Sequence, residues 1–132
     1  MFGRLQATLF FILSPVLFQE TGSSSTRVQL TMHDNGRHVT LHVGDILAIG
    51  LEANPSTGYT WKMVQQDPSL LGEQGTAQFK AASTGLVGAP GIQTLIFKAL
   101  KAGETTLTLG YLRSWESGVP PINTFQITVT IQ

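Results

Sequence analysis

Three histidines are the residues of this chain that most readily suggest chemistry, because imidazole binds metals and transfers protons. His38 and His42 lie four residues apart in a segment with strand-like alternation, which places them on one face of a strand but roughly 13 Å apart. Side chains at that distance cannot share a metal ion bound at about 2 Å. His33 lies across an expected turn from His38, but no carboxylate or third ligand accompanies them. We therefore expect solvent-facing histidines and no metal site.

The sequence also contains no pattern that indicates nucleophilic or acid–base catalysis. No Gly-x-Ser-x-Gly motif occurs, and no acidic pair falls where two strand ends would converge. Glu52, Glu104 and Glu116 each lie near a turn, where they are expected to be solvated. The chain has no cysteine, so it lacks a catalytic thiol, a disulfide and a thiolate ligand. We expect a protein that is not an enzyme and that carries no cofactor.

Composition also excludes several kinds of partner. Lys plus Arg and Asp plus Glu number 8 each, so the formal charge is zero, whereas binding to nucleic acid or an anionic membrane requires a basic surface. The glycine-rich segment GLVGAPG at residues 85–91 lacks the Lys-Ser/Thr ending and following helix of a phosphate-binding loop. Neither a nucleic acid nor a nucleotide is expected as a ligand.

The strongest turn signals lie at residues 54–61, with the sequence NPSTGYTW. Pro55 fixes its own φ and favours an extended conformation of the residue before it. Gly58 can adopt a positive φ, so the chain can reverse tightly with Ser56 and Thr57 at the exposed tip. Such a stiff loop loses little entropy on binding, which suits recognition. The alternative is an ordinary surface turn.

The two tryptophans call for separate interpretations. Trp61 lies just inside an expected strand and is interpreted as a core residue. Trp115 follows Arg113 in a polar loop, and a loop tryptophan beside an arginine is typical of an interface hot spot. The alternative for Trp115 is an indole folded back onto the end of the domain.

Alternation with a period of two, from residue 27 onward, predicts an all-β fold. A cluster of turn residues at 34–36 predicts a tight hairpin, the run 46–51 is apolar on both faces and predicts a central strand, and residues 67–72 predict a short helical turn capped by Asp67. Seven or eight short antiparallel strands indicate a β-sandwich or barrel. Strands are expected at 28–32, 38–43, 46–51, 59–64, 78–82, 94–99, 105–111 and 125–131.

The first 25 residues resemble an export signal. Arg4 precedes an apolar run at residues 5–18, and polar and small residues follow at 19–25. The apolar run is short for a membrane span, which requires about 20 apolar residues. We expect residues 1–25 to be an export signal or a disordered segment, and residues 26–132 to form one domain that acts in the periplasm, at the cell surface or in the medium. An uncleaved anchor is the alternative.

Three segments together resemble the chagasin family of cysteine-protease inhibitors (inhibitor family I42). NPSTGYTW resembles that family's N-P-T-T-G-aromatic-x-W segment. LVGAPG at 86–91, followed by the strand with Phe97, resembles the G-x-G-G loop and its strand. LTLGYLRSWE at 107–116 resembles the L-x-L-x-Y-x-R-P-W segment. The order and spacing agree, and the match extends over roughly residues 27–132.

The resemblance implies an immunoglobulin-like β-sandwich whose BC, DE and FG loops (54–59, 85–92 and 112–118) meet at one end. In the family these loops enter the active-site cleft of papain-like, cathepsin L-like cysteine proteases without being cleaved, and the inhibition is reversible. Ser56 and Thr57 would cover the catalytic cysteine and histidine of the protease. The second and third loops would contact the two sides of the cleft. The implied protease-binding residues are Asn54, Pro55, Ser56, Thr57, Gly58, Tyr59, Leu86, Gly88, Ala89, Gly91, Arg113 and Trp115.

Two departures from the family pattern affect the outer loops. Ser114 stands in place of proline, which predicts a less constrained third loop. Pro90 stands in place of glycine, which stiffens the second loop and removes a donor. The Asn54 side chain is expected to shape the first loop by hydrogen bonds to its backbone. A monomer is expected, and the competing function is a non-inhibitory immunoglobulin-like module for adhesion or glycan binding, because this fold serves many functions.

Overall fold

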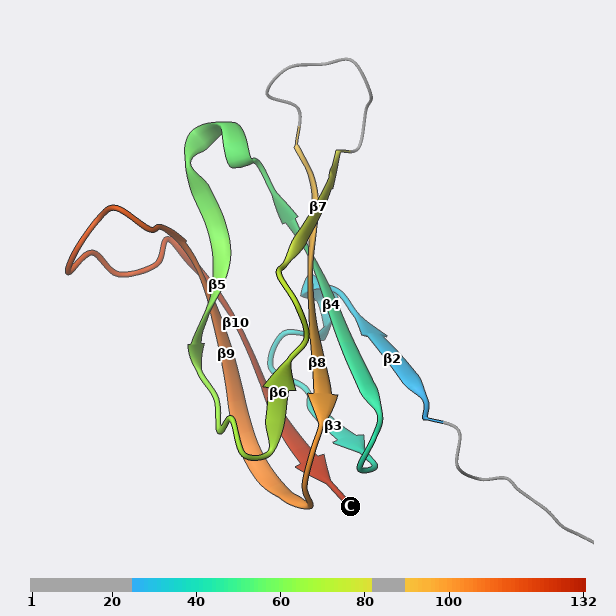
Figure 1. Ribbon diagram of the computed structural model, residues 1–132. Coiled ribbons are helices and arrows are strands. Elements are labelled where there is room, and N and C mark those ends of the chain that lie inside the picture. The colour runs from blue at the N-terminus through green and yellow to red at the C-terminus, as the bar shows by residue number, and fades with distance from the viewer. Residues whose placement is uncertain (1–24, 82–89) are drawn as a thin grey trace, which may run out of the picture.

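Two β-sheets packed face to face make up the protein (Figure 1). The computed structural model describes residues 25–81 and 90–132. One sheet has the order β3-β10-β9-β5 and contains β3 (His38–Leu41), β10 (Asn123–Ile131), β9 (Gly103–Arg113) and β5 (Tyr59–Gln65). The other has the order β2-β4-β8-β6, with β7 also paired to β8, and contains β2 (Arg27–Leu30), β4 (Ile46–Ala53), β8 (Gly91–Ala99), β6 (Leu71–Glu73) and β7 (Gln78–Ala81).

The core lies between the sheets and is built by the alternation seen in the sequence. In β10 the alternate residues from Phe125 to Ile131 are buried, and the polar residues between them face outward. β8 and β9 show the same pattern, since successive side chains of a strand point to opposite faces. The largest side chains that are fully buried are those of Phe97, Phe125, Leu41, Leu47, Ile49, Leu51, Leu71, Leu95, Leu107, Leu109, Ile127 and Val129. The predicted immunoglobulin-like sandwich is confirmed.

The hairpin predicted at residues 34–36 is wrong. β2 pairs in parallel with β4, and β3 pairs in parallel with β10, so the two strands lie in different sheets. The chain crosses between the sheets through a 3-10 turn, Met32–Asp34, in which the Asp34 carboxylate accepts a hydrogen bond from the Thr31 amide (2.9 Å). Residues 34–36 do form a turn, as predicted. The pairing of each strand, however, depends on which of its faces is buried, and the turn residues do not determine it. Both sheets are consequently mixed and not purely antiparallel as expected.

Other predicted elements are placed as follows. β4 is a central strand between β2 and β8, as predicted, and extends to Ala53. Residues 67–70 form a single turn in which the amides of Leu70 and Leu71 both donate to the Asp67 carbonyl (3.0 Å each). The Asp67 side chain accepts from the Ser69 amide (2.9 Å), as expected of a cap. The strand β6 that follows was not predicted.

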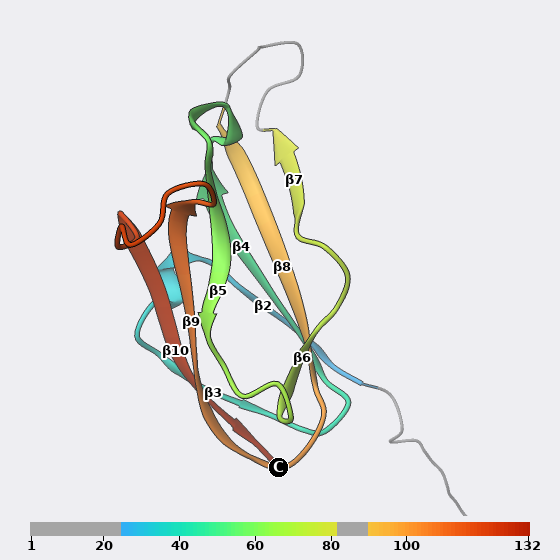
Figure 2. The same ribbon diagram turned by 60° about the vertical axis from the view of Figure 1, so that its left-hand side comes forward.

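The connections β4–β5 and β9–β10 lie at one end of the sandwich, opposite the C-terminus, where β7 ends and β8 begins (Figures 1 and 2). The end of β4 at Ala53 pairs with Gly91 at the start of β8, which also pairs with Ala81 at the end of β7. In the other sheet Tyr59 pairs with Arg113. The register therefore places the ends of β7 and β8 that flank the DE loop of the resemblance at the same end as β4–β5 and β9–β10, which are its BC and FG loops.

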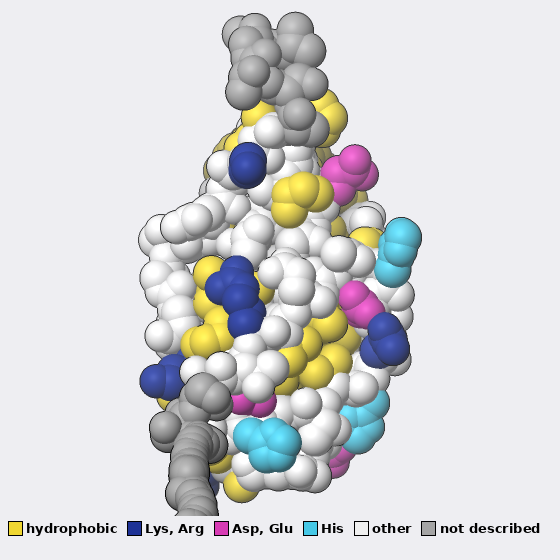
Figure 3. All heavy atoms as spheres, turned by 90° about the vertical axis from the view of Figure 1, so that its right-hand side faces the viewer, with side chains coloured by type: hydrophobic (Ala, Val, Ile, Leu, Met, Phe, Trp, Pro, Cys, Tyr) yellow, Lys and Arg dark blue, Asp and Glu magenta, His cyan; other side chains and the backbone are white. Residues whose placement is uncertain are grey.

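Charged side chains are scattered and not clustered on the face seen in Figure 3, where lysines and arginines lie apart from one another. All three histidines are exposed, and His38 Nε2 lies 2.6 Å from Thr130 Oγ1. Within residues 25–81 and 90–132, no three His, Cys, Asp or Glu side chains are placed to hold a metal ion. The same residues contain no helix long and apolar enough to cross a membrane.

Candidate functional site

The β4–β5 loop adopts the conformation that its residue types specify. Pro55–Thr57 form one 3-10 turn with Asn54 as the N-cap, and the Asn54 Oδ1 accepts from the Ser56 amide (3.2 Å). Gly58 ends the turn with φ +85°, in the left-handed region, and its amide donates to the Pro55 carbonyl (2.9 Å). Ser56 and Thr57 are exposed at the tip. The predicted roles of Asn54, Pro55 and Gly58 in shaping this loop are confirmed.

The two hydroxyl groups at the tip also hold the loop together. The Ser56 hydroxyl donates to Asn54 Oδ1 (2.6 Å), and the Thr57 hydroxyl donates to the Asn54 carbonyl (2.7 Å). Thr57 Oγ1 in turn accepts from the Tyr59 amide (3.3 Å). Every one of these bonds is local, so the loop is ordered without any contact from a partner.

Arg113, at the end of β9, connects the β4–β5 loop to the β9–β10 loop. Its Nε donates to the Thr57 carbonyl (3.1 Å), and its guanidinium carbon lies 4.4 Å from the centre of the Tyr59 ring. The same guanidinium carbon lies 5.7 Å from the centre of the Trp115 ring. Arg113 Nη1 is also 3.7 Å from the Glu116 carboxylate. Cation–π contacts and charge-assisted bonds of this kind favour arginine over lysine.

Trp115 is 68% exposed and nevertheless rests on the neighbouring loop. A Cβ placed on Gly58 would lie 2.1 Å from the indole Cη2 of Trp115, so only glycine leaves room for the ring. Gly58 thus has two functions, the positive φ and the close approach of the indole. The alternative interpretation, an indole folded back onto the domain, is partly right, because one edge of the ring contacts Gly58 while most of its surface faces solvent. The interface role of Trp115 stays a prediction.

Tyr111 and Trp61 support the loop from below. The Tyr111 hydroxyl accepts from the Asn54 amide (2.8 Å), and the Tyr111 ring lies 5.4 Å from the Tyr59 ring and 5.1 Å from Trp61, measured between ring centres. Trp61 is 3% exposed, which confirms it as a core residue. Tyr111 was quoted in a motif but not expected in the site. Tyr111 follows Leu107 and Leu109 at a spacing of two residues, so it lies on the inward face of β9. This spacing was the signal that could have identified Tyr111 as part of the site.

The second loop is described only at its ends, since Leu86, Gly88 and Ala89 lie outside the described residues. Pro90 is exposed and lines a cavity of about 420 Å³ beside the first loop, together with Glu52, Ala53, Asn54, Trp61, Tyr111 and Asn123. Gly91, expected to contact a protease, is buried, and a Cβ there would lie 2.2 Å from the Lys80 carbonyl oxygen. A glycine is therefore required at position 91 for the close pairing of β7 with β8.

Ser114 does not leave the third loop unconstrained. The Glu116 amide donates to the Arg113 carbonyl (3.2 Å), so a hydrogen-bonded turn encloses Ser114 and Trp115. The Arg113–Glu116 ion pair spans the same turn. These two interactions provide constraint where the family pattern has proline. Glu116, expected to be solvated, is partly exposed and pairs with Arg113.

Comparison with known proteins agrees with this geometry. The two packed sheets define an immunoglobulin-like sandwich, and residues 40–129 match the chagasin family of peptidase inhibitors, I42. The chain belongs to this family. It is therefore a peptidase inhibitor and not an enzyme, and the family resemblance seen in the sequence is confirmed.

The relatives include proteins from an amoeba. Amoebiasin-2 of Entamoeba histolytica is 38% identical over 97 residues, which are 72% of this chain and 79% of amoebiasin-2. The crystal structure of the cysteine protease inhibitor EhICP2 from Entamoeba histolytica superposes with a TM-score of 0.72 at 32% identity, covering 84% of this chain and all of that one. PbICP-C, solved in complex with falcipain-2, shares the fold with a TM-score of 0.56 at 24% identity, covering 87% of this chain and 98% of that one.

Proposed function

We propose that this protein is a reversible inhibitor of papain-like cysteine proteases, and that the end of the sandwich formed by loops 54–59, 85–92 and 112–118 occludes the active-site cleft. One observation carries the proposal: the first and third loops are joined into a single body before any partner binds. Arg113 bonds to Thr57, and Trp115 rests on Gly58. A preformed body loses little conformational entropy on binding.

The conformation of the tip explains how the loop can occupy a protease without being cut. Pro55–Thr57 form a 3-10 turn, whereas a peptide that adds to an enzyme groove in substrate fashion is extended. The hydrogen-bonded hydroxyls of Ser56 and Thr57 hold that turn closed. The peptide bonds at the tip are thus not presented to the catalytic thiolate in a cleavable geometry.

The exposed side chains of the site suit a cleft that is apolar with a polar margin. Trp115 offers most of an indole surface to the partner, and tryptophan and arginine are the residues most enriched among interface hot spots. The class of target agrees with EhICP2, which is a cysteine protease inhibitor. The acting form is proposed to be exported, because residues 1–25 carry the pattern of an export signal.

An inhibition assay against papain and a cathepsin L-like protease tests the proposal. The purified protein should titrate active protease at one to one, and dilution of the complex should restore protease activity. Mass spectrometry after long incubation should find the chain uncut between residues 54 and 60. A folded protein that leaves both proteases fully active at micromolar concentration, or one that is cleaved in this loop as inhibition is lost, would contradict the proposed function.

A further inference from the structure

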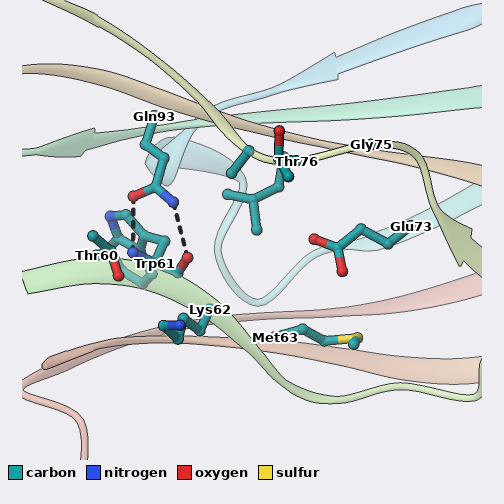
Figure 4. Close-up of a pocket in the computed structure, with 10 residues that line it drawn as sticks. Thr60, Trp61, Lys62, Met63, Glu73, Gly75, Thr76 and Gln93 are labelled. Atoms are coloured by element: carbon teal, nitrogen blue, oxygen red, sulfur yellow. Dashed lines mark hydrogen bonds between the residues drawn. The ribbon is translucent and has the colours of Figure 1, made fainter. Parts of the chain in front are cut away.

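A buried glutamine in one sheet forms two hydrogen bonds with the backbone of the other. Gln93 of β8 is 7% exposed, and its Oε1 accepts from the Trp61 amide (2.8 Å) while its Nε2 donates to the Trp61 carbonyl (2.9 Å) (Figure 4). A neighbouring strand would make the same pair of bonds. The Gln93 side chain therefore acts as a strand partner for one residue of β5.

These bonds lie on the side of β5 that has no neighbouring strand among the residues that the structure describes. β5 pairs with β9 on one side. On its other side lies a cavity of about 460 Å³ between the sheets, lined by Thr60, Trp61, Lys62, Met63, Glu73, Gly75, Thr76, Ala77, Gln93 and Leu95 (Figure 4). An unpaired strand edge leaves backbone donors and acceptors unsatisfied. Gln93 satisfies those of Trp61 at the inner wall of this cavity.

Trp61 is close enough to the first loop for this restraint to matter. Only Tyr59 and Thr60 separate it from Gly58. Its indole Nε1 donates to the Glu52 carbonyl (3.0 Å), at the other stem of the same loop. The amide, the carbonyl and the indole nitrogen of Trp61 are thus all bonded to β4 or β8 of the opposite sheet, and Gln93 provides two of these three bonds.

We propose that Gln93 is a positioning residue of the inhibitory site: its amide group sets the depth and orientation of β5, and through Tyr59 the placement of the 54–58 tip relative to Arg113 and Trp115. This inference rests on the proposed function. It assigns a role in binding to a residue that is buried in the free protein and lies outside the three proposed contact loops. Its removal leaves the amide and carbonyl of Trp61 unpaired in a buried position, which is unfavourable.

The first test is Gln93→Leu in the full chain, with Gln29→Leu as the matched control. Gln29 is exposed on β2 of the same sheet. Gln93→Leu should weaken inhibition of papain at least about tenfold, and Gln29→Leu should leave it unchanged. In the free protein, hydrogen exchange at the Ser56 and Gly58 amides should be faster in Gln93→Leu than in the control. A folded Gln93→Leu variant with wild-type inhibition and wild-type exchange would overturn the proposal.

The second test is Gln93→Glu, which tests the positioning role of Gln93 even if Gln93→Leu does not fold. A protonated carboxyl at position 93 can both accept from the Trp61 amide and donate to its carbonyl, whereas an ionised one places a negative charge against the carbonyl oxygen. Burial raises the pKa of such a carboxyl above the ordinary value of about 4.3. The ratio of variant to wild-type inhibition constants should therefore fall towards one as the pH is lowered from 7 to about 4.5.

The ratio of inhibition constants isolates the effect of the carboxyl at position 93. The pH dependence of the protease is common to both measurements and cancels in the ratio. Lys62 and Glu73, which line the same cavity, shift the pKa of the introduced carboxyl in opposite directions and so affect the pH at which the ratio changes. A ratio above one that does not change with pH would overturn the positioning role. If the wild-type protein itself fails to inhibit, the proposed function fails, and hydrogen exchange then reports separately whether Gln93 orders the loop.

Discussion

At the scale of single residues, the site depends on residues that each have two structural roles. Arg113 bonds to the Thr57 carbonyl and stacks on Tyr59. Gly58 provides a positive φ and the space for Trp115. Because each residue serves both the folded loop and its neighbour, substitutions here should affect binding through order as well as through lost contact. Among the exposed large hydrophobic side chains of the described residues, Trp115 has the largest exposed fraction, 68%.

Trp115→Ala should weaken protease inhibition by about 2 kcal/mol or more, which is the loss typical of an anchor residue. The indole is 68% exposed in the free protein, so its surface is available to a partner. The inhibition constant against papain measures the effect. Val119→Ala is the control, because Val119 is 52% exposed in the same connection and lies outside the proposed contact loop. An unchanged constant for Trp115→Ala would leave Trp115 with a purely structural role.

At the scale of elements, two short turns build the described part of the site. One is the 3-10 turn Pro55–Thr57, and the other is the turn that the Glu116 amide closes on Arg113. Each is held by its own hydrogen bonds, and β5 and β9 pair directly beneath them, with Tyr59 opposite Arg113. The strand pairing therefore sets the distance between the turns, and the contact of Trp115 with Gly58 joins their tips.

Gly58→Ala should separate these two turns. A Cβ at this position would lie 2.1 Å from Trp115, so the indole must move away, and the positive φ adds strain of about 1 kcal/mol. Inhibition should weaken on the order of tenfold or more. Gly36→Ala is the matched control, because Gly36 has φ +87° and no atom within 4 Å of the added Cβ.

Comparison of the two alanine variants isolates the contact between the loops. Both carry the same kind of backbone strain, and Gly58→Ala also displaces the indole, so urea denaturation should show a loss of unfolding free energy for Gly58→Ala at least as large as that for Gly36→Ala. Only Gly58→Ala should change the inhibition constant. Equal inhibition by the two variants would show that contact between Trp115 and the first loop has no part in binding.

At the scale of the whole molecule, the end opposite the site is stabilised by a buried carboxylate. Asp45 is 7% exposed, and its two oxygens accept from the amides of His42 (2.8 Å) and Thr26 (3.0 Å). These bonds hold the start of β2 and the end of β3 beside the start of β4. The amides of His42 and Thr26 keep the pKa of Asp45 below its ordinary value of 3.8.

Asp45→Asn should lower the free energy of unfolding by about 1–2 kcal/mol at pH 7, because the amide group can replace only one of two acceptors. Since the pKa of Asp45 is depressed in the folded state, its contribution is complete above the unfolded value of about 3.9 and is lost as the pH falls through the folded value. The difference between wild type and variant should therefore shrink below about pH 4.

Urea denaturation at several values between pH 7 and pH 2.5 measures this dependence. Glu73→Gln removes the same charge from an exposed position and should have a small effect at every pH. A difference between wild type and Asp45→Asn that is as large at pH 2.5 as at pH 7 would contradict the role given to the ionised carboxylate.

Much of the fold and of the first loop followed from local sequence. Alternation predicted which residues of β9 and β10 are buried, and the Asn54, Pro55 and Gly58 types predicted the turn that they form. Gln93 was missed because the strand was expected to begin at residue 94, so its place on the inward face of β8 was not seen. The prediction of a hairpin at 34–36 was wrong for a related reason, because turn residues do not determine which sheet the next strand joins.

Features that depend on neighbours along the chain could be predicted from the amino-acid sequence: the alternation of buried residues, the conformation of the 54–58 loop and the family pattern of three segments. Interactions between distant positions became visible in the folded structure alone. Tyr111 reaches Asn54 across 57 residues, Gln93 reaches Trp61 across 32, and Arg113 reaches Thr57 across 56. Such contacts depend on strand register and on the packing of the two sheets, and no local preference of either residue specifies them.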